Sequence, residues 1–345
     1  MSQKSIYSVP IQGLKRWFVL QREQPFRATQ VAQWVYKENL VDFERMTNLS
    51  TDLRRKLSAD WQFTRLELLK LQKSALDGTR KILFRLSDGE TIETVLIPDE
   101  GRLTLCISSQ VGCKMGCSFC LTAEQKLQRQ LKADEIVAQF LEARRILEPG
   151  ERISNIVFMG MGEPLDNFDE VKKAIEVISD QQGLGFGRRK IAISTVGVAP
   201  NMIRVLKEIR VRLVLSLNAV SDELRREIMP IARKYSLDYL LQTLRELPIS
   251  DKNPIMIAYT LLSGVNDSDE DAYKLVRLLK GIPCKINLIP YNPYPGSKFS
   301  RPTEERWKSF HKIVLSNHYV VTTRISGGLD ILAACGQLRS ANNLD

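Results

Sequence analysis

Hydrophobic and polar positions near the start of the chain follow a helical spacing. Between residues 11 and 58, apolar side chains such as Val31 and Val35 recur one helical turn apart, which predicts short amphipathic helices. Ser50 or Thr51 supplies a hydroxyl that can cap the next helix. We therefore expect a small helical domain over residues 1–75.

Two strand-like runs follow this helical segment. Residues 81–86 and 91–97 are largely apolar and flank Ser87–Glu90, whose Asp-Gly pair predicts a hairpin turn. The Pro-Asp-Glu-Gly sequence at residues 98–101 marks a second break. We expect residues 76–101 to form a β-hairpin linker.

From residue 103 the pattern alternates between apolar strands and amphipathic helices. The strand candidates are Leu103–Ile107, Ile153–Met159, Lys190–Ser194, Val211–Leu215, Ile255–Leu261, Lys285–Ile289 and Val320–Arg324. The helical candidates are Ala133–Leu147, Phe168–Ser179, Leu237–Leu247, Ser268–Lys280 and Glu304–Ser316. Repeated βα units predict an α/β fold, a parallel sheet with helices outside it. About six units are fewer than a closed eight-unit barrel has, so we expect residues 102–345 to form a partial, open barrel.

Composition narrows the range of partners. No apolar run approaches the ~20 residues that a membrane span needs, and residues 1–16 lack the apolar segment of a secretory signal. We therefore expect a cytoplasmic protein without membrane contact. The formal charge of +10, from 50 Lys and Arg against 40 Asp and Glu, suits a polyanionic partner. The N-terminal helices can either guide RNA or form a solvated lid.

The sequence contains only two histidines, His311 and His318, which argues against a histidine general base.

The clearest chemical signal is a cluster of cysteines. Cys113, Cys117 and Cys120 have the spacing CxxxCxxC, directly after the first strand of the barrel. Three thiolates can hold three irons of one 4Fe–4S cluster and leave the fourth iron free to bind a small molecule, which in this pattern is S-adenosylmethionine (SAM). The alternative is a zinc site, with Cys106 or Cys335 as fourth ligand.

Polar residues follow several of the later strands. Gly160-Met-Gly162-Glu163-Pro164 combines glycines that allow close approach of a ligand with a carboxylate that can accept from an ammonium group, which predicts the site of the SAM amino group. Ser194, Ser216, Asn218 and Asn292 stand at the ends of other strands. Ligands bind at these carboxyl ends in parallel sheets, although each residue alone is equally typical of an ordinary loop.

With these residues in place, the chain resembles the RlmN/Cfr family of radical SAM RNA methyltransferases, and the resemblance covers nearly the whole chain. The similar segments are Pro25–Gln30 with Trp34 and Tyr36, Leu105–Cys113, the cysteine cluster, Gly160–Asn167 and Ala333–Leu338. The sequence is more similar to the RlmN branch. The resemblance implies a partial (β/α)6 barrel with a small N-terminal helical domain, and methylation of the adenine C2 carbon in 23S rRNA and in tRNA.

The resemblance also implies a role for individual residues. Cys113, Cys117 and Cys120 match the ligands of one 4Fe–4S cluster. Gly162, Glu163, Ser194, Ser216, Leu217, Asn218 and Asn292 match SAM-binding positions. Cys335 matches the cysteine that carries the methyl group, and Cys106 matches its resolving partner. Glu93 matches a proton acceptor of relatives, a role for which the Cys106 thiol is the alternative.

The chemistry explains why two thiols are needed. The C2 carbon of adenine lies between two ring nitrogens and is electron-poor, so it does not attack the SAM methyl group by displacement. The hypothesis uses two SAM molecules per turnover: one methylates Cys335, and the other supplies a radical that removes a hydrogen from that methyl group. The methylene radical adds to C2. Cys106 then attacks Cys335, releases methyladenine and leaves a disulfide that an external reductant must reset with two electrons. We also expect an external one-electron reductant as a partner.

Some positions depart from the family's pattern. Lys126-Leu127 and Arg129-Gln130-Leu131 replace Gly-Phe and Arg-Asn-Leu, Asn218 replaces histidine, and residues 325–329 are less basic than in relatives. These changes bear on substrate choice more than on chemistry. The alternatives are methylation at C8, a zinc-stabilised RNA-binding module without catalysis, and a radical SAM enzyme that acts on protein. We expect a monomer.

Overall fold

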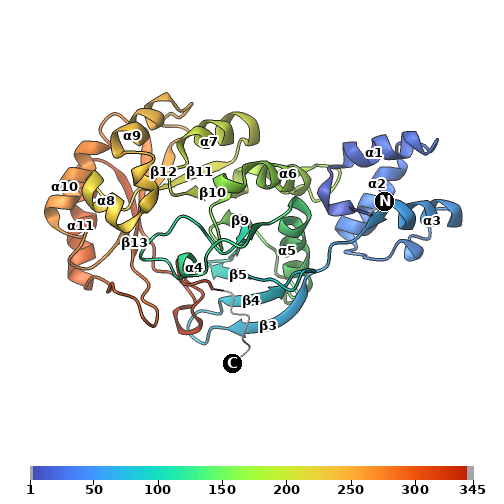
Figure 1. Ribbon diagram of the computed structural model, residues 1–345, viewed down its shortest axis with the longest axis horizontal. Helices are drawn as coiled ribbons and strands as arrows, with labels where there is room; N and C mark the ends of the chain where they lie inside the picture. The colour runs from blue at the N-terminus through green and yellow to red at the C-terminus, as the bar shows by residue number, and fades with distance from the viewer. Residues whose placement is uncertain (1–2, 340–345) are drawn as a thin grey trace.

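The computed structural model describes residues 3–339. A group of helices at one end of the molecule comprises α1 (Ile11–Leu20), α2 (Arg27–Ala32) and α3 (Thr51–Asp60) (Figure 1). Their apolar faces are buried, as at Leu14 and Phe18 of α1, and Ser50 Oγ accepts a hydrogen bond from Leu53 N at 3.3 Å. The predicted N-terminal helices and the serine cap are confirmed.

One large sheet forms the other part of the molecule. Within residues 3–339 ten strands share it in the order β14-β13-β12-β11-β10-β9-β6-β5-β4-β3. Their bounds are β3 (Glu67–Lys73), β4 (Arg80–Arg85), β5 (Thr91–Asp99), β6 (Arg102–Cys106), β9 (Asn155–Phe158), β10 (Ile191–Thr195), β11 (Arg212–Ser216), β12 (Ile255–Leu261), β13 (Cys284–Pro290) and β14 (Val320–Thr323). Neighbours from β6 to β14 are parallel, whereas β3, β4 and β5 add an antiparallel extension. Two short pairs, β1 (Lys4–Ser5) with β2 (Trp61–Gln62) and β7 (Gln110–Val111) with β8 (Arg129–Gln130), lie outside it.

Helices follow the parallel strands and pack outside the sheet (Figure 1). They are α5 (Ala133–Arg145), α6 (Phe168–Ser179), α7 (Ala199–Arg204), α8 (Asp222–Ile228), α9 (Leu237–Glu246), α10 (Asp269–Leu278) and α11 (Glu304–Ser316). The short helix α4 (Leu121–Glu124) instead follows β7 and does not belong to this outer layer. The five predicted helices correspond to α5, α6, α9, α10 and α11. The α/β class, the open parallel sheet and the hairpin of β4 and β5 are therefore confirmed.

The pleat of the parallel strands separates a core from a site. On β10, Ile191 and Ile193 are fully buried, whereas Ala192 and Ser194 alternate with them and are half-buried. Successive side chains of a strand point to opposite faces, so one set packs against the helices and the other faces the inside of the curved sheet. The inner face is therefore where polar side chains meet.

The pairing of β3 bears on the predicted boundary at residue 75. β3 lies within residues 1–75 but pairs with β4, and the division at residues 1–75, 76–101 and 102–345 stays a prediction.

In the part of the chain that the structure describes, no helix has both the length and the apolar character for crossing a bilayer.

Candidate active site

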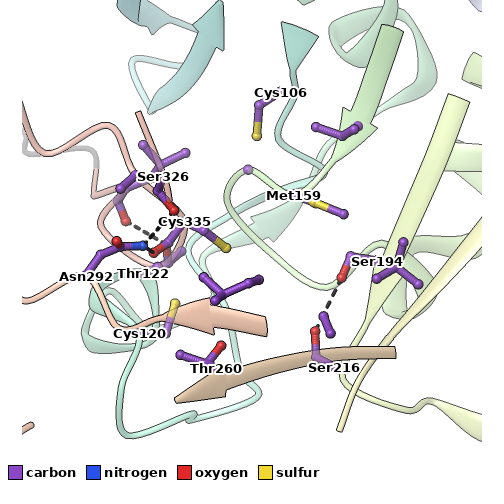
Figure 2. A pocket seen from close by; sticks show the side chains of 18 of the residues that line it. Cys106, Cys120, Thr122, Met159, Ser194, Ser216, Thr260, Asn292, Ser326 and Cys335 are labelled. Carbon is purple, nitrogen blue, oxygen red and sulfur yellow. Dashed lines mark hydrogen bonds between the residues drawn. The ribbon is translucent and has the colours of Figure 1, made fainter. Parts of the chain in front are cut away.

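A cavity at the carboxyl ends of the parallel strands collects most of the predicted site residues (Figure 2). The predicted residues that line it are Cys106, Cys117, Cys120, Gly162, Glu163, Ser194, Ser216, Asn218, Asn292 and Cys335. They come from strand ends and loops that are separated by more than two hundred positions in sequence. Glu93, Cys113 and Leu217 are not among the described residues that line the cavity.

The cysteine loop runs between β7 and α4 and sits in apolar surroundings. Cys113, Cys117 and Cys120 share a cluster of buried side chains with Met115 and Met229. The loop is held by its own backbone, since Cys113 N donates to Gln125 O at 3.1 Å and Cys120 N to Cys117 O at 3.1 Å.

Burial controls the protonation of these thiols. It raises the pKa of Cys113 to about 12 and the pKa of Cys117 well above its usual range, and the neighbouring cysteines raise both further. Burial also raises the pKa of Cys120. Thiolates in such a place form only beside a strong positive charge, and bound iron supplies one. The donor set therefore fits an iron–sulfur cluster.

The arrangement differs from that of a single-ion site. Among residues 3–339, no three Cys, His, Asp or Glu side chains are grouped as ligands of one metal ion. The thiolates of a cubane cluster bind different irons, so they do not need to converge on one point.

The Gly160–Pro164 turn places a carboxylate in the cavity. Gly162 has a φ of 97°, and a Cβ there would overlap the Gln110 side chain. Glu163 is 3% exposed, and its carboxylate accepts from Val196 N at 2.9 Å and Leu165 N at 3.0 Å. Burial raises its pKa to about 7 despite these hydrogen bonds. A buried carboxyl of this kind favours a cationic ligand such as an ammonium group.

The next two strands bring their polar ends together. Ser194 Oγ lies 3.4 Å from Ser216 Oγ (Figure 2). Asn218 has a φ of 59°, a conformation that asparagine adopts more readily than most residues. Its Oδ1 accepts from Thr260 N at 2.8 Å, and its Nδ2 lies 3.4 Å from Met229 Sδ. Asn218 therefore ties the end of β11 to β12. Leu217 is fully buried behind these side chains.

Asn292 links the cavity to the loop that carries Cys335. Its Nδ2 donates to Ser326 Oγ at 3.0 Å and to the Cys335 carbonyl at 3.2 Å (Figure 2). Its Oδ1 accepts from Arg301 at 2.8 Å, which fixes the orientation of the amide. Asn292 therefore positions the Cys335 loop from inside the site.

The two remaining thiols border the same cavity. Cys106 ends β6 and is 6% exposed, whereas Cys335 is exposed, and both are free. Burial raises the pKa of Cys106 to about 12, the nearby Cys335 raises it further, and Arg324 opposes both effects. Figure 2 shows Cys106, Cys120 and Cys335 around one space.

Glu93 occupies a different position from these thiols. It is 4% exposed on β5, where its carboxylate pairs with Lys81 at 3.0 Å and accepts from Arg339 N at 2.9 Å. Burial raises its pKa, and Lys81 opposes that rise. Its side chain is thus engaged in holding the segment after Cys335.

The sequence pattern did not predict several of the residues that line the cavity. Met159, Thr260, Asn287, Arg324 and Ser326 also line the site. Thr260 and Asn287 lie on β12 and β13 within apolar runs, and the alternation of inward and outward positions was the signal that could have found them.

Comparison with known proteins agrees with this geometry. Residues 107–276 match the model of the radical SAM superfamily, and residues 5–62 match the ribosomal RNA large subunit methyltransferase N-terminal domain. The chain is 47% identical to the dual-specificity RNA methyltransferase RlmN of Pelobacter propionicus, over 98% of this chain and 97% of that protein. It is 46% identical to the protein of the same name from Geotalea uraniireducens, over 98% and 97%. The chain belongs to the RlmN family.

A solved structure supports the same assignment. The RlmN-family chain superposes on a radical SAM methyltransferase from Sphaerobacter thermophilus with a TM-score of 0.91 and 39% identity, over 97% of this chain and 99% of that one. The fold class and the family resemblance are confirmed, and so are the cofactors of the family, a 4Fe–4S cluster and SAM. These matches concern the family and the fold and give no residue a role, so the roles of the individual site residues stay predictions.

Proposed function

We propose that this chain is a radical SAM enzyme that methylates the C2 carbon of an adenosine in 23S rRNA and in tRNA. The observation that carries the proposal is that the free thiols Cys106 and Cys335 border the same cavity as Cys117 and Cys120. The names of the relatives and of the N-terminal family model support RNA as the substrate, and large-subunit rRNA in particular.

Cys113, Cys117 and Cys120 would hold the cluster, and Glu163 would accept a hydrogen bond from the amino group of SAM. Ser194, Ser216, Leu217 and Asn218, at the ends of β10 and β11, would form the rest of the SAM site together with Gly162 after β9 and Asn292 after β13. When bound, the cluster and SAM supply a carbon radical that removes a hydrogen atom from a methyl group. The buried, largely apolar walls exclude water from that chemistry.

The two thiols have successive roles. The Cys335 sulfur attacks the methyl group of one SAM, and its exposure to the cavity gives it access to the cofactor. After hydrogen removal, the sulfur-bound methylene forms a bond to C2. The adduct then gives one electron to an acceptor, which the oxidised cluster would supply, and the C2 proton to a base. Cys106 then attacks the Cys335 sulfur, the carbon–sulfur bond breaks, and the released carbon takes up a proton. The resulting disulfide needs an external reductant.

The C2 proton has two candidate acceptors, and we propose Cys106. It lines the cavity, whereas the Glu93 carboxylate is occupied by Lys81 and by Arg339 N. Glu93 would then order the segment that follows Cys335. Burial raises the pKa of both thiols, and the Arg324 cation opposes that rise.

The remaining features of the proposal concern the setting of the enzyme. We propose that residues 1–75 guide RNA, residues 76–101 link that domain to the barrel, and residues 102–345 carry the chemistry. The enzyme would act as a monomer in the cytoplasm, with a one-electron donor as partner. The net charge of +10 supports an RNA partner.

Product analysis tests the proposed reaction. Anaerobically reconstituted enzyme, SAM and reductant are incubated separately with 23S rRNA and with tRNA, and digested nucleosides are identified by mass spectrometry against standards. The expected product in both is 2-methyladenosine. Reactions without reductant are the control. A main product of 8-methyladenosine would reject C2 as the site of methylation. The metal content of the purified protein is measured in parallel, and stoichiometric zinc without iron would reject the proposal that the protein is a radical SAM enzyme.

A further inference from the structure

A buried arginine lies beneath the candidate cluster loop. Arg225, on α8, is fully buried. Its Nε donates to Leu217 O at 3.2 Å, its Nη2 to Val196 O at 2.7 Å, and its Nη1 to Tyr235 O at 3.4 Å. Neutral carbonyls thus satisfy its hydrogen-bonding groups. Asp222 on the same helix acts on its charge but forms its ion pair with Arg226, at 3.8 Å. A charge buried in this way is costly unless it serves a purpose.

The helix that carries Arg225 packs against the cysteine loop. Ser118 N, next to Cys117, donates to Ile228 O at 3.0 Å, and a Cβ on Gly116 would lie 3.4 Å from the Pro230 ring. Ile228 and Met229 share the apolar cluster of Cys117. This contact brings α8, and with it the buried Arg225, against the cysteine loop.

The charge of Arg225 is opposite in sign to the charges of the carboxylates near the cysteine loop. The Arg225 guanidinium donates to Val196 O, and Val196 packs against the apolar cluster that contains Cys117. The other charged side chains with the strongest effect on the three thiols are the carboxylates Glu163, Asp166 and Glu124, besides the cysteines themselves. A cluster that gains an electron here gains negative charge among carboxylates. Lys114 of the loop is 55% exposed and pairs with Asp166 at 2.7 Å, so solvent and that carboxylate reduce its effect. Arg225 is buried, and its charge favours the reduced state.

We propose that Arg225 is a positioning residue that raises the reduction potential of the cluster by placing an unpaired, buried positive charge beside Cys117. The inference rests on the proposed function, since it requires the cluster on Cys113, Cys117 and Cys120. Net charge and burial around a cluster are known determinants of its potential. Because the site is buried, solvent screens the interaction little.

The chain offers a matched control on the same helix. Arg226 has a side chain that is 48% exposed and lies 3.8 Å from Asp222. Replacing it with glutamine removes the same charge one residue away, but solvent screens an exposed charge. Arg225→Lys gives the complementary variant, which keeps the charge and loses the guanidinium's hydrogen-bond geometry.

The test is a redox titration of the anaerobically reconstituted full-length proteins, followed by electron paramagnetic resonance, with iron and sulfide content measured in parallel. Arg225→Gln is expected to lower the midpoint potential by at least a tenfold shift in the reduction equilibrium, about 59 mV for one electron. Arg226→Gln and Arg225→Lys are expected to stay close to wild type.

Each outcome decides the proposal. An unchanged potential in Arg225→Gln, or an equal fall in Arg226→Gln, overturns it. If Arg225→Gln does not fold, the lysine variant decides: a potential near wild type supports the role of charge, and a lowered one overturns it. A wild-type protein that binds no cluster instead refutes the proposed function, before the arginine is tested.

Discussion

The Cys106 thiol gives the sharpest test at the scale of single residues. In the proposed reaction it breaks the bond between Cys335 and the RNA, and it borders the cavity opposite the cluster loop. Cys106→Ala is therefore expected to stall the reaction as a covalent RNA–protein adduct, visible as a shifted band on a denaturing gel.

The control for this variant is the other thiol. Cys335→Ala, alone or combined with Cys106→Ala, should give neither adduct nor methylated RNA, because the carbon has no sulfur to bind. Normal methylation by Cys335→Ala would refute the mechanism with two thiols.

The Glu163 carboxyl predicts how SAM binding depends on pH. Burial raises its pKa from 4.5 to about 7, and an ammonium group binds the ionised form. As pH falls through about 7, the carboxyl takes up a proton that bound SAM must displace, so affinity decreases. We expect roughly tenfold weaker binding at about pH 6 than at about pH 8, measured by calorimetry.

Two variants test whether the pH dependence of SAM binding comes from Glu163 or from another carboxyl group. Glu163→Gln should bind SAM weakly at both pH values, since it cannot ionise. Glu124→Gln, which changes a side chain that is 48% exposed, should keep the wild-type profile. A wild-type affinity that does not change across this range would contradict the role of Glu163.

At the scale of elements, the turn between β3 and β4 holds the segment that leads to Cys335. Ser74 Oγ donates to Asp330 Oδ1 at 2.7 Å, and Asp77 Oδ2 accepts from Gly328 N at 2.8 Å. The close approach of Gly327 to Asp77 leaves no room for a side chain. A hairpin outside the parallel sheet thus positions a residue near the other end of the chain.

Asp77→Ala tests this contact. Loss of its hydrogen bonds should lower stability by about 1 kcal/mol and slow the methylation of Cys335 by roughly tenfold, because the loop samples more conformations. Single-turnover mass spectrometry of the protein measures that rate, and thermal unfolding measures stability. Asp88→Ala, in the next hairpin turn, is the control. Equal rates in both variants would show that the turn does not position Cys335.

The sequence predicted long elements better than short ones. α6 and α11 have the predicted bounds, because their apolar stripes are long and Thr303 caps α11. β3, α7 and α8 were missed. β3 is an edge strand with largely exposed side chains, so it lacks the alternation of a half-buried strand, and α8 is only two turns long.

At the scale of the whole molecule, the N-terminal helices are fixed to the barrel. Ile11 N donates to Asp180 Oδ2 at 2.8 Å, Arg144 donates to Tyr36 O at 2.6 Å, and Asn39 Nδ2 donates to Leu141 O at 3.3 Å.

The residues of the active site were predictable from the sequence only in part. Motifs and resemblance identified its residues, but the bonds of Asn292 and Arg225 to distant loops follow from the tertiary structure.

RNA binding tests the proposed role of the N-terminal helices. Arg55 is exposed on α3, and Arg55→Glu should raise KM for RNA, leave kcat nearly unchanged and reduce the salt dependence of binding by about one ion. Lys280→Glu, an exposed charge reversal just after α10 at the other end of the molecule, is the control (Figure 1). Equal effects of the two variants would contradict an RNA-guiding role for these helices.

The central claim is that the transferred carbon passes through Cys335 as a methylene. Mass spectrometry of the methyladenosine made with SAM whose methyl group is fully deuterated tests it directly. If Cys335 loses one hydrogen before the carbon reaches C2 and a proton is added on release, the product retains two of the three deuterium atoms, and the third appears in 5′-deoxyadenosine. A product that keeps all three deuterium atoms would mean that the methyl group is transferred intact, and would contradict the account.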